Sequence, residues 1–316
     1  MIVEKITIHH PHDLNKAEIS PLVMALGYFD GVHKGHQKVI STAKRYADEH
    51  QLKTAVMTFD PHPSVVLGRK HQHVRYITPL EEKMKVFEDL GVDIAFVVRF
   101  TSDFASLTPQ EFVDQYIIML NVQHVVAGFD YTYGRLGKGT METIQFHSRD
   151  TFTYTTVAKL TEREAKISST KIRECIAEGQ IETVHNLLDR PYHTKGTVVH
   201  GDKRGRKIGF PTANIEQEDT YLIPRTGVYS VQIFVQNKWY DGVCNVGYKP
   251  TFKNPDEKVL SIEVHIFNFD HSIYGEEIQL KWFKRIRDEQ KFNGIEALIS
   301  QIEKDKMTAL AFFKNH

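Results

Sequence analysis

The chain has 316 residues, of which 41% are hydrophobic and 25% charged, with 40 basic and 40 acidic side chains. This length is typical of a two-domain protein, and this composition is typical of a globular one. The balanced charge argues against broad binding to nucleic acid or an anionic membrane. There is no apolar run near the roughly 20 residues of a membrane span, no signal-peptide pattern, and no disulfide framework from Cys175 and Cys244. We therefore expect a cytoplasmic enzyme acting on small molecules; the oligomeric state stays open.

Short apolar strands and helical patterns alternate in the first half of the chain. The spacing predicts strands over 22–26, 54–59, 93–98 and 124–128, and helices over 37–49, 79–90 and 109–120. Thr78 and Thr108 are the expected caps of the last two helices, each followed by proline. This alternation predicts a Rossmann-like parallel sheet with helices on both faces. Ligands of such sheets bind at the carboxyl ends of the strands.

The most informative segment is a glycine-rich turn between the first of these strands and its helix. It contains Gly27, Phe29 and Gly31, and it ends in His33 and His36 at the helix start. Free backbone N–H groups and the helix dipole favour an anion there, and histidines three residues apart share one helical face. The turn therefore predicts a phosphate site. Two alternatives stay open: a metal site, although no third ligand lies nearby in sequence, and ordinary surface histidines.

Three further segments are expected near the same edge of the sheet. Asp60 and His62 follow the second strand, and Asp130, Tyr131 and Tyr133 follow the fourth. The two tyrosines are able to stack on a flat ring or simply pack in the protein. The third segment opens a further helix with hydroxyls and cations, including Ser168, Ser169, Thr170 and Arg173. It indicates a second anion site, or alternatively a hydroxyl cap followed by a charged solvent face.

No nucleophile paired with a base emerges from the first half. A reaction without a protein nucleophile fits better, and nucleotidyl transfer is such a reaction. The substrate phosphate attacks the α-phosphate of ATP, while the enzyme supplies position and charge neutralisation.

The second half changes to short alternating strands over 194–199, 227–235, 239–246, 259–267 and 278–283, then a helical pattern over 295–313. This predicts a small antiparallel β-barrel with a carboxyl-terminal helix. We place the domains at 1–186 and 187–316.

A basic, glycine-rich loop precedes a Pro-Thr-Ala-Asn tetrad in the second half. The loop contains Gly201, Lys203, Gly205, Arg206 and Gly209. Glycine lets the backbone approach an anion closely, although a basic surface hairpin is the simpler alternative. In the tetrad, Thr212 and Asn214 have oxygen ligands suited to magnesium or phosphate.

Further along, one strand carries Glu263 and His265 on the same face. A carboxylate inside a barrel is able to deprotonate an alcohol, whereas a lone strand glutamate more often faces solvent. Arg287 and Glu289 follow at the expected rim of the barrel.

Segments 27–36, 59–63, 128–134 and 167–173 together resemble the adenylyltransferase half of the bacterial bifunctional riboflavin kinase/FAD synthetases. The resemblance implies the fold of the histidine-motif nucleotidyltransferases and adenylylation of FMN by ATP. It implies catalytic roles for His33, His36 and Arg173. It implies ATP binding by Gly27, Phe29, Gly31, Ser168, Ser169 and Thr170, and flavin binding by Asp60, His62, Asp130, Tyr131 and Tyr133. The two tyrosines stand where phenylalanine is commoner in the family, which adjusts only the packing of flavin or adenine.

The glycine-rich loop, the tetrad, segment 245–252, the Glu263 strand, Tyr274-Gly275 and segment 287–292 follow the order of the riboflavin kinase half of the same family. By this resemblance Gly201, Lys203, Gly205, Arg206 and Gly209 bind ATP. Thr212 and Asn214 hold magnesium-ATP, Glu263 is the base, and Arg287 and Glu289 lie near the flavin.

We therefore expect conversion of riboflavin to FMN in the barrel, and of FMN to FAD and pyrophosphate in the first domain, with Mg²⁺ and ATP. Three alternatives stay open: a family member with one activity, a flavin-binding regulatory protein, and a transferase acting on a different phosphate ester.

Overall fold

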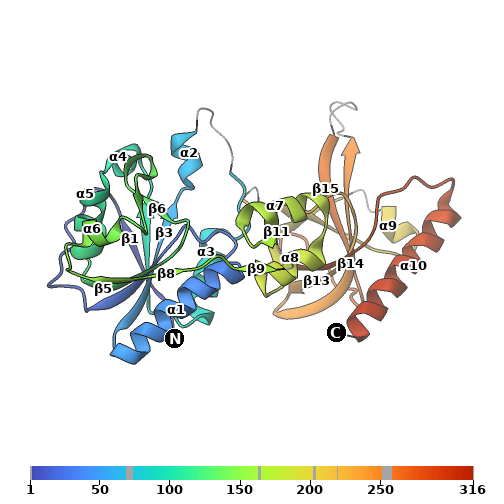
Figure 1. Cartoon of the computed structure of the whole chain (residues 1–316). Coiled ribbons are helices and arrows are strands. Elements are labelled where there is room, and N and C mark those ends of the chain that lie inside the picture. The colour runs from blue at the N-terminus through green and yellow to red at the C-terminus, as the bar shows by residue number, and fades with distance from the viewer. Residues whose placement is uncertain are drawn as a thin grey trace. The chain divides into compact units, whose positions relative to one another are not determined.

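The computed structural model describes residues 2–68, 74–162, 165–201, 204–218, 220–250 and 258–315. It divides into two compact units, Met1–Ser169 and Thr170–His316 (Figure 1). The division falls earlier than residue 186, where the sequence led us to place it. The reason is that α8 (Ile181–Leu188) packs on the barrel, where His185 Nε2 lies 2.6 Å from the carbonyl oxygen of Trp282.

The first unit is built on a parallel six-stranded sheet in the order β1-β4-β3-β2-β5-β8. The strands are β1 (Glu4–Ile8), β2 (Leu22–Leu26), β3 (Lys53–Asp60), β4 (Ile94–Arg99), β5 (Val122–Gly128) and β8 (Thr153–Val157). Two short antiparallel pairs join β6 (Thr132–Tyr133) to β7 (Gly139–Thr140), and β9 (Thr161–Glu162) to β10 (Ala165–Lys166). The order reverses beside β2, so the ends of β2, β3 and β5 open onto one place at the carboxyl edge.

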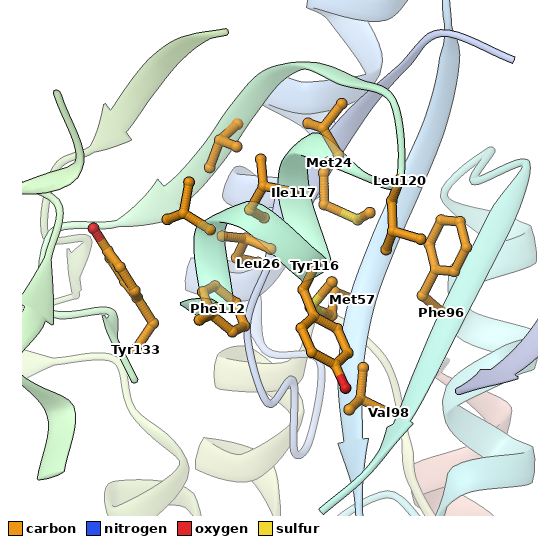
Figure 2. Packing of buried hydrophobic residues seen from close by; sticks show 14 of the residues in the cluster. Met24, Leu26, Met57, Phe96, Val98, Phe112, Tyr116, Ile117, Leu120 and Tyr133 are labelled. Carbon is orange, nitrogen blue, oxygen red and sulfur yellow. The ribbon is translucent and has the colours of Figure 1, made fainter. Parts of the chain in front are cut away.

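The helical segments beginning in the first unit are α1 (Lys34–His50), α2 (Pro63–Leu67), α3 (Leu80–Asp89), α4 (Ser102–Ser106), α5 (Pro109–Val113), the π-helix η1 (Asp114–Ile118), the 3₁₀ turn η2 (Arg135–Gly137), α6 (Ile144–Ser148) and α7 (Ser169–Glu178). Both faces of the sheet are covered, as predicted. On one face, Phe112, Tyr116 and Ile117 of the α5–η1 segment, with Leu120 just after it, pack against strand residues such as Met24 (Figure 2). On the other face, α1 and α3 bury a second apolar cluster.

Local signals set the helix boundaries in two different ways. Thr108 caps α5 in a full capping box, accepting from the N–H of Glu111 while the Glu111 carboxylate accepts from the N–H of Thr108. The expectation for Thr78 was wrong. Pro79 is the residue before α3, without a side-chain cap, and the N–H of Thr78 instead donates to Asp30. Thr78 lies one residue before the cap position, and this hydrogen bond ties it to Asp30.

The second unit is a closed antiparallel barrel in the order β11-β12-β15-β14-β13-β16. Its elements after α8 are β11 (Tyr192–Val199), α9 (Arg204–Lys207), β12 (Ala213–Gln217), β13 (Gly227–Val235), β14 (Lys238–Pro250), β15 (Lys258–Ile266), β16 (Glu277–Arg287) and α10 (Ile295–Lys314). Buried and half-buried positions alternate along β11, as a barrel wall requires. Helix α10, red in Figure 1, packs on the barrel through Ala309, near Val228 and Val243. The barrel and its helix are as predicted.

Candidate active sites

The turn between β2 and α1 has a strained backbone. Phe29, Gly31 and Val32 all lie in the left-handed region, with φ of 57°, 83° and 39°. Glycine adopts this region freely, whereas a β-branched valine does so only under strain. Phe29 and Val32 are buried, so packing holds the turn in shape. Strain maintained in this way is typical of ligand-binding sites.

His33 and His36 form one compact unit at the start of α1. The Nδ1 atom of His33 accepts a hydrogen bond from the N–H of His36 at 3.2 Å, and the two rings stack with centroids 3.6 Å apart. Because Nδ1 accepts, a neutral His33 carries its hydrogen on Nε2. A Cβ at Gly35 would lie 3.1 Å from the His33 ring, so glycine leaves the space that this ring needs.

The two alternatives for these histidines are weaker in the structure. His33 is only 6% exposed, which is unlike an ordinary surface histidine. Within the ranges that the structure describes, no three histidine, cysteine, aspartate or glutamate side chains gather as a metal site. The arrangement suits hydrogen-bond donation to an anion.

Lys83, a buried lysine that we did not predict, is hydrogen-bonded to the backbone of the turn. Lys83 Nζ donates to the carbonyl oxygen of Tyr28 at 2.9 Å and to Thr58 Oγ1 at 3.2 Å. Thr58 Oγ1 donates to the same carbonyl at 2.8 Å. Burial lowers the pKa of Lys83 to about 8, against the opposing pull of Asp30 and Asp60. The sequence signal was a lysine in the apolar stripe of a helix, between Leu80 and Phe87.

Asp30 ties three segments of the first unit together. Its Oδ1 accepts from the N–H groups of Ile77 and Thr78 at 3.1 and 3.2 Å, and its carbonyl oxygen accepts from Ser169 Oγ at 2.8 Å. The structure thus brings Ser169, and with it the neighbouring Ser168, to the histidine turn. Thr170 and Arg173 lie on α7 in the second unit.

The other predicted residues of the first unit have varied surroundings. Asp60 pairs with Arg99 at 3.0 Å, and the His62 ring meets the Tyr28 ring edge-on at 4.4 Å. Asp130 and Tyr131 follow β5 at the sheet edge, Asp130 exposed and Tyr131 half-buried.

Tyr133 is a core residue. It is 4% exposed, it packs on Phe112, and its hydroxyl hydrogen-bonds His147 Nδ1 at 2.8 Å. These contacts suit a ring that supports Tyr131 from behind.

In the second unit, five of the predicted residues line one cavity of about 360 Å³: Gly205, Thr212, Glu263, Arg287 and Glu289. Its lining includes Gly205, Phe210, Thr212, Val243, Asn245, Glu263, His265, Arg287, Glu289, Gln290, Phe292 and Asp305. Apolar walls with a few convergent polar groups are typical of small-molecule sites.

Glu263 is at the centre of a polar cluster beside this cavity. Asn214 and Asn245 are its direct neighbours on the strands to either side. Its carboxylate accepts from Thr212 Oγ1 and Ser261 Oγ, both at 3.3 Å. Lys249 Nζ lies 2.5 Å from Glu263 Oε1 and donates to Asn214 Oδ1 at 3.2 Å. Sequence reasoning missed Lys249, because nothing local marks its contact with β12 and β15.

Close packing surrounds the glycine-rich loop. A Cβ at Gly201 would lie 2.2 Å from Asn214 Nδ2, and one at Gly205 would lie 2.3 Å from the carbonyl oxygen of Phe210. Gly209 has a φ of 86° and needs glycine for its conformation. Arg206 is exposed, and Lys203 lies outside the described residues.

At the rim of the cavity, Arg287 forms a two-pronged ion pair with Asp305 of α10. Nε donates to Oδ1 at 2.9 Å and Nη2 to Oδ2 at 2.8 Å. Glu289 lies against Gly247, where a Cβ would come within 2.1 Å of Glu289 Oε1. Burial raises the pKa of Glu289, although Arg287 opposes this.

Comparison with known proteins decides the family. The FAD synthetase family model matches residues 15–171, and the riboflavin kinase model matches residues 188–313. The bifunctional riboflavin kinase/FMN adenylyltransferase of Bacillus subtilis is 55% identical over 98% of both chains. The chain belongs to this family. The Escherichia coli K12 member is 33% identical over 96% of both chains.

The bifunctional riboflavin kinase/FMN adenylyltransferase fold also has a close match among solved structures. A crystal structure from Streptococcus pneumoniae, described as a macrolide-efflux protein, aligns with a TM-score of 0.88 and 36% identity over 97% of this chain and 99% of that one. In the described part of the present chain, no helix is long and apolar enough to cross a membrane.

Membership assigns both activities to this chain. It is a riboflavin kinase and an FMN adenylyltransferase, with the FAD synthetase match covering the histidine turn and the riboflavin kinase match covering the barrel. The residue expected to divide the domains, 186, falls between the two matched stretches.

Proposed function

We propose that the histidine turn performs the adenylyl transfer. The observation that carries this assignment is the stacked His33–His36 pair, whose Nδ1 hydrogen bond directs the Nε2–H of His33 away from the helix backbone. In the reaction, an oxygen of the FMN phosphate bonds to the α-phosphorus of ATP, and the bond to pyrophosphate breaks. Donors placed where negative charge develops stabilise such a transition state.

The remaining residues of the first site then have definite roles. Gly27, Phe29 and Gly31 shape the turn that receives the ATP phosphates, and Ser168 and Ser169 add hydroxyls. For Thr170 and Arg173, on α7, the family resemblance alone supports a role in ATP binding. Asp60, His62, Asp130 and Tyr131 contact the flavin, with Tyr133 supporting Tyr131 from the core. The edge-on contact of His62 with Tyr28 supports placing the flavin residues close to the turn.

We propose that Glu263 is the general base of the kinase. It would take the proton from the terminal ribityl hydroxyl of riboflavin as that oxygen bonds to the γ-phosphorus and ADP leaves. Arg287 and Glu289 line the same cavity and would hold the flavin. Gly201, Lys203, Gly205, Arg206 and Gly209 would approach the ATP phosphates.

The donor set beside Glu263 fits magnesium. Thr212 Oγ1, Asn214 Oδ1 and the Glu263 carboxylate are all oxygen ligands, which this ion prefers, and they lie within one hydrogen-bonded cluster. We assign the metal to Thr212 and Asn214. When bound, Mg²⁺ neutralises charge on the phosphates being transferred.

Two variants test the assignments, with each reaction measured separately by supplying either riboflavin or FMN. His33→Ala should lower FMN adenylylation by about 10²–10³-fold and leave riboflavin phosphorylation unchanged. Glu263→Gln should lower phosphorylation by about 10²–10⁴-fold and leave adenylylation unchanged. A folded variant that loses both reactions to the same extent would contradict two separate sites.

A further inference from the structure

The side chain of Lys249 lies where the proposed metal site has its oxygen donors. Along β14, Asn245, Gly247 and Lys249 share one face, and Asn245 lines the cavity. Lys249 Nζ reaches along this face to Glu263, the register partner of Asn245. Its ammonium group thus lies within the polar cluster.

The contacts of this ammonium group match those expected of a bound cation. Nζ touches one carboxylate oxygen, Glu263 Oε1 at 2.5 Å, and one amide oxygen, Asn214 Oδ1 at 3.2 Å. These oxygens come from neighbouring strands, where Asn214 and Glu263 face each other in register. One positive charge therefore joins the expected base to an expected metal ligand.

This ion pair is also exchangeable. The side chains of Lys249 and Glu263 keep 39% and 23% of their exposure to solvent. Ion pairs with this much access to water are weak, because hydration compensates both charges when they separate. A magnesium ion needs its ligands at about 2.0–2.1 Å and would repel an ammonium group held on the same oxygens.

From these contacts we propose that Lys249 is an internal counter-cation of the kinase site. In the ligand-free enzyme it holds Glu263 and Asn214 together, and it must leave Asn214 before magnesium binds there. Lys249 is then a positioning residue that sets the affinity of the site for metal. The inference rests on the proposed assignment of the metal to Thr212 and Asn214.

The test uses the full chain and free Mn²⁺ as the probe, with unbound Mn²⁺ measured by electron paramagnetic resonance. We expect Lys249→Met to bind Mn²⁺ about tenfold more tightly than the unmodified chain, because a competing group weakens binding by the fraction of time it occupies the donors. Lys249→Arg keeps the charge and should restore weak binding. Lys304→Met, which removes an exposed lysine of α10, should bind as the unmodified chain does.

The Asn214→Ala change, made with and without Lys249→Met, identifies the site. Loss of Mn²⁺ binding in both backgrounds, together with tighter binding in Lys249→Met alone, supports the inference. If Asn214→Ala abolishes binding but Lys249→Met leaves the affinity unchanged or weaker, the role of Lys249 is overturned while the metal site stands. If Asn214→Ala leaves binding intact, the metal site fails and the inference with it. A damaged fold would not produce tighter binding.

Discussion

Lys83 Nζ donates to the carbonyl oxygen of Tyr28 across 2.9 Å, inside the protein and directly beneath the histidine turn. The next residue, Phe29, has a φ of 57°, so the chain turns sharply at the peptide that this lysine holds. Thr58 Oγ1 is the second donor to the same oxygen. Two donors on one carbonyl fix the direction in which the strained turn leaves β2.

The change Lys83→Met should therefore weaken adenylyl transfer without affecting the kinase. Methionine fills a similar volume but donates no hydrogen bond, so the carbonyl oxygen of Tyr28 keeps only its bond from Thr58. We expect the kcat/KM for ATP in FMN adenylylation to fall at least about tenfold, the loss of one charge-assisted hydrogen bond. The matched control is Lys53→Met, which changes an exposed lysine at the end of β3 away from Thr58. Equal rates in the two variants would show that Lys83 does not position the turn.

The same lysine gives a pH dependence of stability with a definite sign. Its pKa is about 8 in the folded chain, against an ordinary value of 10.5. Between these values the unfolded chain binds more protons, so the free energy of unfolding rises with pH. Below pH 8 the buried ammonium charge lowers the free energy of unfolding by its full amount. Above pH 10.5 this lysine is neutral in both the folded and the unfolded chain, and the rise in stability is complete.

Urea unfolding of the unmodified chain and of Lys83→Met, compared from pH 7 to 11, checks this. The free energy of unfolding of the unmodified chain should rise relative to the variant between pH 8 and 10.5. A difference that stays constant across this window would show that Lys83 remains charged when folded.

The sequence predicted those parts of the structure that depend on local patterns. Apolar strands alternating with helices gave the parallel sheet, and Thr108 followed by proline gave the cap of α5. The same reasoning was wrong at Thr78, because α3 begins at Leu80 and Pro79 is the residue before it. Cap rules describe local partners only, whereas the N–H of Thr78 donates to Asp30, 48 residues away along the chain.

Lys83 and Lys249 could not be predicted as site residues from the sequence, for a related reason. Lys83 reads as part of a helix, and its function depends on the carbonyl of Tyr28 on another segment. Lys249 lies beyond the predicted strand 239–246, and its contact with Asn214 exists only once the barrel closes. Motif residues such as His33 are recognisable because the glycines, the histidines and the helix start lie within a few consecutive positions. Supporting residues are brought to the site by the fold.

A third prediction concerns the space above Gly247. A methyl group there would lie 2.1 Å from Glu289 Oε1 and would push this carboxylate aside. Because the obstructed atom is the end of a flexible side chain, Gly247→Ala should fold normally. If Glu289 holds the flavin, the KM for riboflavin should rise about tenfold, the worth of one polar contact, with kcat little changed.

The double variant Gly247→Ala/Glu289→Ala tests whether the effect passes through Glu289. Two changes acting on one contact are not additive, so the double variant should be no worse than Glu289→Ala alone. Additive losses would mean that the alanine disturbs the cavity by another route.

The last prediction concerns the ion pair between Arg287 and Asp305. Asp305 is 3% exposed, and its carboxylate accepts from two nitrogens of the Arg287 guanidinium and from Gln301. Asp305→Asn keeps the shape but removes the charge, leaving a largely buried guanidinium without its counter-ion. Breaking such a pair typically costs about 3–5 kcal/mol. We expect a loss near the lower value, because the Arg287 side chain keeps 20% of its exposure.

The measurement is urea unfolding followed by the fluorescence of Trp239 and Trp282, both within the barrel. Asp270→Asn removes a carboxylate that is 94% exposed and should leave the transition unchanged. Because Arg287 and Asp305 both line the cavity, the freed guanidinium should also raise the KM for riboflavin while FMN adenylylation stays normal. A stable Asp305→Asn variant with an unchanged KM would show that α10 covers the barrel without organising the rim of its cavity.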